Sequence, residues 1–232
     1  GQARARCVRV STLAWQRMGM RVDAFGSPLP DRDLARCGTL TLLDHDLAWL
    51  DLSPDGRTVA SSCLSGIAHV WDVSTGRLLH AVSTAFGGVR SGAYGRDGSS
   101  LFLGTDTGAL LRLDLQQGRC VELRRFPNAV DAVACSASGR MAVGLVGEHE
   151  SVLLVGEHDA ALLTVGLGRR TWQLAFSPDG RRLAALRVDG HTSEETQCWI
   201  WSMDDSVLLH HWSMASMERH GAVRFLDDRT LA

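Results

Sequence analysis

Three classes of glycine-containing turn recur along this sequence at a nearly fixed interval. Members of the first class are separated by 42, 41 and 41 residues, and the other two classes follow the same step. A repeat of this length predicts a single array of similar structural units. The turns end at Gly56, Gly98, Gly139 and Gly180 in the first class, at Gly66 and Gly108 in the second, and at Gly76 and Gly118 in the third.

The clearest unit spans residues 47–84 and contains four short apolar runs, LAWLDLS, TVASSC, IAHVWDV and RLLHAVST. They are separated by Pro54-Asp55-Gly56, Ser65-Gly66 and Ser74-Thr75-Gly76. These are turn residues, because Gly accepts positive φ, Pro fixes φ, and Asp and Ser bond to nearby backbone. Each unit is therefore predicted to be a four-stranded antiparallel sheet.

Two segments, VWDVSTGR at 70–77 and AFSPDG at 175–180, resemble the WD40-repeat family of β-propellers. The resemblance implies an all-β fold, a WD40-type β-propeller with four-stranded antiparallel blades. It also implies structural roles for Ser61, Trp71 and Asp72: Ser61 and Trp71 match positions of the family's hydrogen-bonded tetrad, and Asp72 completes the family's Trp-Asp pair. Ser65 replaces the turn Asp of that tetrad, so no unit carries a complete set.

The repeats divide the chain into one incomplete propeller segment of about four to five blades with open ends, a fragment of a longer propeller. We expect an incomplete first blade at 1–46, full blades at 47–86, 89–126, 129–167 and 171–214, and the start of a further blade at 220–232. Alternation along the strands places six side chains in the layers between blades. They are Val59, Trp71, Leu101, Leu103, Phe176 and Leu183.

The amino-acid composition limits which partners the chain can bind and which cellular compartment suits it. A hydrophobic content of 45% supports a continuous core, and a net charge of −2 gives no general attraction to nucleic acid or an anionic membrane. No uninterrupted apolar run is long enough to span a bilayer. The six cysteines lack CxxC and CxxH spacing, which argues against zinc and favours a reducing, cytoplasmic location.

Catalytic and metal-binding motifs are absent from the sequence. His149 and His158 flank a strand, so their turns lie about 17–20 Å apart, too far to share one ion. No GxSxG, HExxH or P-loop is present. We therefore expect no metal, no cofactor and no enzymatic activity. The alternative is an enzymatic or small-ligand-binding propeller whose site residues converge on the central channel.

The longest second turn is GHTSEETQ at 190–197, where other units need two or three residues. Such a loop is either a neutral expansion or a binding element. The pairs Arg124-Arg125 and Arg169-Arg170 lie near connections between blades, and are either solvated turns or recognition residues.

Two antiparallel strands separate the second turn of a blade from the connection to the next blade. The chain therefore returns to the same end, and we expect second turns and inter-blade connections to lie together at that end. The opposite end carries short turns that offer little to a partner. We thus predict that a protein or peptide partner binds at the end that carries the second turns and the connections. The chain is expected to be a non-catalytic scaffold. The resemblance implies that it is the docking or sensing arm of a larger regulatory protein. The predicted binding residues are His45, Asp46, Arg169, Arg170, His191, Glu194 and Glu195.

Overall fold

The computed structural model describes residues 47–64, 66–147, 151–155, 160–164, 171–188, 195–215 and 223–231. Within these ranges the chain consists of strands and turns and contains no helix. In particular, the described residues contain no helix long and apolar enough to cross a membrane. The prediction of an all-β chain built from four-stranded antiparallel sheets is confirmed.

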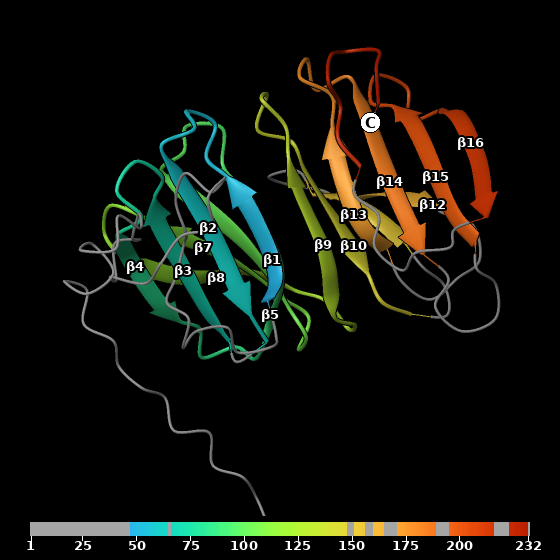
Figure 1. Cartoon of the computed structure of the whole chain (residues 1–232). Helices are drawn as coiled ribbons and strands as arrows, with labels where there is room; N and C mark the ends of the chain where they lie inside the picture. Colours follow the sequence, from blue (N-terminus) through green and yellow to red (C-terminus); the bar gives the residue numbers. More distant parts are fainter. Residues whose placement is uncertain are drawn as a thin grey trace, which may run out of the picture.

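In the described residues, sixteen strands form four sheets, and in each sheet the strands pair in chain order (Figure 1). The first sheet contains β1 (Leu47–Leu52), β2 (Thr58–Cys63), β3 (Ile67–Asp72) and β4 (Leu78–Ser83); the second contains β5 (Val89–Tyr94), β6 (Ser100–Thr105), β7 (Ala109–Asp114) and β8 (Arg119–Arg125); the third contains β9 (Val130–Cys135), β10 (Met141–Leu145), β11 (Ser151–Val155) and β12 (Ala160–Thr164); and the fourth contains β13 (Thr171–Phe176), β14 (Arg182–Val188), β15 (Glu195–Ser202) and β16 (Leu208–Ala215).

The first strands of the four sheets lie next to one another. β5 contacts β1 on one side and β9 on the other, and β9 in turn contacts β13 (Figure 1). The sheets therefore stand face to face, with their first strands innermost. This arrangement is β-propeller-like, and it follows from sheets that are apolar on both faces and must bury both.

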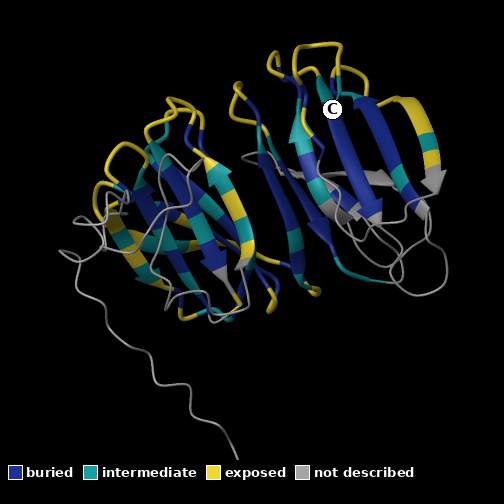
Figure 2. Cartoon of the chain, viewed as in Figure 1, coloured by how far each residue is buried: buried dark blue, intermediate teal, exposed yellow. Residues whose placement is uncertain are grey.

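Buried apolar side chains fill each interface between neighbouring sheets. Separate clusters join the first sheet to the second, the second to the third, and the third to the fourth. A fourth cluster packs Val223 and Phe225 against the outer face of the fourth sheet. Figure 2 shows burial concentrated in the inner strands, whereas β4 and β16 expose much of their length.

Five of the six predicted core side chains are buried, with relative exposures of 7% or less for Val59, Trp71, Leu101, Leu103 and Leu183. Phe176 is the exception, because it is only half-buried at the edge of the cluster between the third and fourth sheets. It is the last residue of β13, where the sheet gives way to a turn. Trp199 and Trp201 are buried in the same cluster, so they pack in the core.

The recurring first turn is closed by its own Ser and Asp side chains. In the fourth sheet, Ser177 Oγ donates to Asp179 Oδ1 at 2.6 Å and accepts the backbone N–H of Arg182 at 2.9 Å. The backbone N–H of Arg181 also donates to Asp179 Oδ1. Ser53 and Asp55 make the equivalent bonds in the first sheet. These contacts explain why Ser-Pro-Asp-Gly recurs.

The third turn requires a left-handed residue near its end. Gly76 and Gly118 occupy that position with φ of 65° and 63°, respectively. In the fourth sheet the residue is Ser206, with φ of 59°. A side chain in this conformation is disfavoured relative to glycine, so the fourth sheet carries local strain at this turn.

One predicted loop boundary is wrong. The second turn of the fourth sheet was expected to include residues 190–197, but β15 already begins at Glu195. Thr196 pairs with Val188 on one side and with Met214 on the other. Pairing on both sides extends the strand into a polar segment that would otherwise be assigned to a loop.

Candidate interaction surfaces

The antiparallel order of the strands gives the stack of sheets two different ends. The turn end carries the first turns of the four sheets and the third turns of the first, second and fourth sheets. The connection end carries the second turns of the first and second sheets together with the connections that follow these two sheets (Figure 1). The backbone N–H of Thr84, in the first connection, donates to Gly66 O of the first sheet's second turn at 2.8 Å. In the same way, Phe126 N donates to Gly108 O in the second sheet.

The connection between the first and second sheets is fixed by the next second turn. Gly88 N donates to Asp106 Oδ1 at 2.9 Å, and Thr107 Oγ1 donates to the carbonyl of Phe86. Within the turn, Thr105 Oγ1 accepts the N–H of Ala109 at 2.9 Å and lies 3.1 Å from Thr107 Oγ1. Neighbouring loops at the connection end are therefore bonded to each other.

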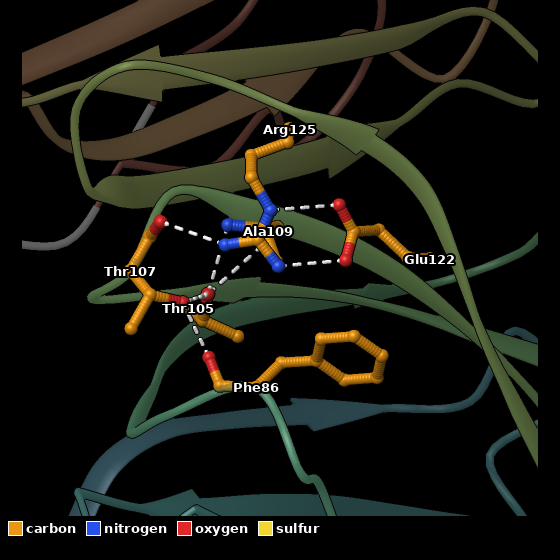
Figure 3. A network of polar contacts seen from close by, with 6 residues as sticks. All are labelled: Phe86, Thr105, Thr107, Ala109, Glu122 and Arg125. Carbon is orange, nitrogen blue, oxygen red and sulfur yellow. Dashed lines mark hydrogen bonds and ion pairs between the residues drawn. The ribbon is translucent and has the colours of Figure 1, made fainter.

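Arg125 at the end of β8 ties a third element into this network (Figure 3). Its Nε and Nη2 donate to the two carboxylate oxygens of Glu122 at 2.9 and 2.7 Å, and its Nη1 donates to Thr107 O at 3.2 Å. A planar guanidinium that makes three directed bonds orients the outer strand against the turn. Arg125 thus acts first as a structural brace, although its side chain remains exposed.

Arg124, its neighbour, makes a different contact. Its guanidinium carbon lies 5.4 Å from the centre of the Phe126 ring, within the range of a cation–π interaction. Arg124 is exposed whereas Phe126 is buried. The hydrogen-bonding edges of Arg124 are consequently open to a partner, which distinguishes it from Arg125.

The three positions matched to the WD40 family lie in the first sheet. Trp71 Nε1 donates to Ser61 Oγ at 3.1 Å, so these two residues do meet. Asp72, the Asp of the Trp-Asp pair, caps the third turn, because its Oδ1 accepts Ser74 Oγ and both the N–H and the hydroxyl of Thr75. These bonds, led by the one from Ser74, hold the pKa of Asp72 below its ordinary value.

The predicted binding residues fall almost entirely outside the described ranges. Only the backbone of Glu195 is described, as the first residue of β15. The His149 and His158 turns also lie outside the described residues. The binding assignment therefore stays a prediction for His45, Asp46, Arg169, Arg170, His191, Glu194 and Glu195.

Charged residues on the innermost strands interact mostly with protein groups. Arg90 on β5 and Asp131 on β9 form an ion pair at 2.7 Å across two sheets. Asp51 on β1 accepts the N–H of Tyr94 at 3.3 Å, and burial raises the pKa of this carboxyl group. In the described part of the chain, no cluster of three His, Cys, Asp or Glu side chains could hold a metal ion.

Cys120, Cys135 and Cys198 are free thiols. Burial raises the pKa of Cys135 to about 12 and that of Cys198 to about 11. Both thiols therefore stay protonated near neutral pH, and neither has the thiolate character of a nucleophile.

Comparison with known proteins supports the fold and not a family. No family model matches the chain, and no curated protein matches it. Among solved structures, hydrazine synthase from Kuenenia stuttgartiensis is similar, with a TM-score of 0.62 and 17% sequence identity over 77% of this chain and 52% of that one. The chain thus spans about half the length of that structure. Matching solved chains number 1411, and a fold so widely used does not specify one function.

This structural neighbour corrects one expectation. The chain was expected not to be an enzyme, but a protein that shares its fold is named as a synthase. The fold therefore gives no ground for excluding catalysis. A missing sequence motif does not exclude catalysis, because catalytic residues in sheet arrays can come together from distant repeats.

Proposed function

We propose that the four sheets are blades of a WD40-type β-propeller that serves as a protein-docking platform within a larger regulatory protein. Support for the type comes from the bond between Trp71 and Ser61, which joins two positions of the family tetrad. The free cysteines agree with a reducing compartment, and we place the protein in the cytoplasm. The partner is a protein or peptide that binds at the connection end.

The observation that carries this proposal is the hydrogen-bonded network at the connection end (Figure 3). It holds loops of two neighbouring sheets in fixed positions while leaving Asp106, Thr107 and Arg124 exposed. Exposed polar groups on a preorganised backbone bind a partner with a small loss of conformational entropy. The exposed carboxylate of Glu122 and the exposed guanidinium of Arg125 also lie side by side here, and a mixture of charges gives specificity for one partner over others.

The longest second turn predicted from the sequence also belongs to the connection end. Except for Glu195, which is the first residue of β15, the predicted binding residues come from second turns or from connections, so they should extend the surface at the connection end. Among them Arg169 and Arg170 are basic, and Glu194 and Glu195 are acidic. A partner that spans neighbouring sheets would contact both sets.

The proposal can be tested with a phage-displayed library of random peptides selected on the immobilised chain. Binding of the selected peptides should fall when Arg124, Arg169, Arg170, Glu194 and Glu195 are replaced by alanine together. The matched control replaces Asp55 and Asp97 at the turn end by alanine. Peptides that bind the first variant normally but fail on the control would show that docking does not occur at the connection end.

A further inference from the structure

A hollow of about 360 Å³ lies at the turn end, between the fourth sheet and the C-terminal segment that follows it. This volume lies within the range of known ligand pockets. The short turns at this end are expected from the sequence to offer little to a partner, and the hollow lies among them. We call it the turn-end hollow. Its charged lining residues are Asp179, Arg181, Arg182, Asp204, Asp228 and Arg229.

The walls of the turn-end hollow are fixed by bonds between distant segments. Asp179 N donates to Asp228 Oδ1 at 2.8 Å, which joins the first turn of the fourth sheet to the turn after Phe225. Phe225 itself is buried in the cluster against the fourth sheet. The side chain of Asp179 is held in turn by Ser177 and by the N–H of Arg181. Both carboxylates therefore have donors within the protein.

The guanidinium groups of the hollow are in the opposite situation. Within the described ranges, the side chains of Arg181, Arg182 and Arg229 make no hydrogen bond and no ion pair within 4 Å. Arg125 shows what a satisfied guanidinium looks like in this protein, with Glu122 and Thr107 as acceptors. Arg181 and Arg182 interact with Asp179, and Arg229 with Asp227, through charge without a direct hydrogen bond, so the three guanidinium groups have donors left for the acceptor oxygens of a ligand.

The net charge of the lining residues indicates which kind of acceptor group the hollow can bind. Three arginines and three aspartates contribute charges that sum to zero. The aspartates repel a polyanion such as nucleic acid, or a dianionic phosphate group, more strongly than they repel a group with a single negative charge. A single carboxylate carries one charge, and its two oxygens match the planar fork of arginine. The lining thus favours isolated carboxylates over dense negative charge.

We propose that the turn-end hollow binds aspartate or glutamate side chains of a protein segment. It is a second docking site, at the end of the sheets opposite the connection end. The bidentate pairing expected of Arg181, Arg182 and Arg229 selects a partner whose acidic residues are spaced among neutral ones. The site does not depend on the proposed docking at the connection end.

The test compares peptide selection on two forms of the full chain. A random phage-displayed library is selected on the wild-type chain and, in parallel, on a variant carrying Arg181→Ala, Arg182→Ala and Arg229→Ala. Peptides recovered only with the wild-type chain should be enriched in Asp and Glu. The affinity of such a peptide should fall about tenfold with Arg181→Ala or Arg229→Ala alone. Replacing its acidic residues by Asn or Gln should have a similar effect.

Arg57→Ala is the matched control, because Arg57 occupies the position of Arg181 in the first turn of the first sheet. It should leave the affinity unchanged, and thermal melting should show that every variant folds. Equal recovery of acidic peptides on the triple variant, or no enrichment of acidic residues, would overturn the proposal. So would inorganic phosphate or heparin binding more tightly to the hollow than the peptides do. Peptides that bind the turn-end hollow should still bind the variant with alanine at Arg124, Arg169, Arg170, Glu194 and Glu195. The two proposals can therefore be tested separately.

Discussion

The indole Nε1 of Trp71 donates a hydrogen bond to Ser61 Oγ at 3.1 Å, and so joins β3 to β2 across the first sheet. Trp71 is 3% exposed, whereas Ser61 is half-buried. A bond from a buried ring to a side chain on the adjacent strand fixes the ring's orientation in the core. Its energetic value can be measured directly.

Ser61→Ala removes the acceptor of this bond and should lower the free energy of unfolding by about 0.5–1.5 kcal/mol. A double-mutant cycle with Trp71→Phe isolates the bond, because the cycle subtracts what each substitution does alone. Denaturant melts of the four proteins supply the measurement. Additive effects of the two substitutions would show that the bond contributes nothing to stability.

Ser206→Gly should stabilise the protein by about 1 kcal/mol, because it removes a side chain from the left-handed region. The reciprocal substitution is Gly118→Ser, since the space around Gly118 is open and φ alone opposes a side chain there. It should destabilise by a similar amount. Thermal melting compares both variants with the wild-type chain. A stabilising Gly118→Ser would refute the assignment of strain to this position.

Arg90→Met breaks the ion pair with Asp131, whose side chain is 8% exposed. A buried carboxylate that loses its charged partner is costly, and we expect a loss of about 2–3 kcal/mol in the free energy of unfolding. The double variant Arg90→Met/Asp131→Asn removes both charges and should recover part of that loss. If both variants melt at the same denaturant concentration as the wild-type chain, the pair does not join the sheets.

The carboxyl group of Asp179 should titrate below its ordinary value of 3.8, because hydrogen bonds from Ser177 and then from Arg181 N lower its pKa. A lowered pKa in the folded state means that this stabilisation is present above pH 3.8 and is lost as the pH falls through the folded value. Ser177→Ala should move the pKa of Asp179 upward. An NMR titration of the carboxyl carbons measures both values, and a wild-type pKa at or above 3.8 would contradict the expected shift.

Local patterns in the sequence predicted the sheets well. The turn glycines set the period, and the apolar runs between them match β1 to β4 closely, because turn chemistry depends on neighbouring residues. The half-burial of Phe176 and the start of β15 at Glu195 were missed. Both depend on how far the adjoining strands and sheets extend, which local patterns do not contain.

The candidate sites were harder to predict for the same reason. Arg124 and Arg125 are adjacent in the sequence, but the strand directs their side chains to different neighbours. Arg125 is hydrogen-bonded to Glu122, whereas Arg124 lies over the Phe126 ring and keeps its N–H groups exposed. The turn-end hollow joins Asp179 to Asp228, about fifty positions apart along the chain. Its only signal in the sequence is the doubled arginine at 181–182, which has no counterpart after the first turns of the other sheets.

Hydrogen exchange on a peptide complex tests docking at the connection end most directly. Peptides are selected on a chain carrying Arg181→Ala, Arg182→Ala and Arg229→Ala, so that the turn-end hollow does not contribute. Exchange of the backbone amides is then followed by mass spectrometry with and without the bound peptide. We predict slower exchange in segments 84–88, 105–108 and 126–129. Protection confined to the first turns around Asp55, Asp97 and Ser138, with none in these three segments, would contradict docking at the connection end.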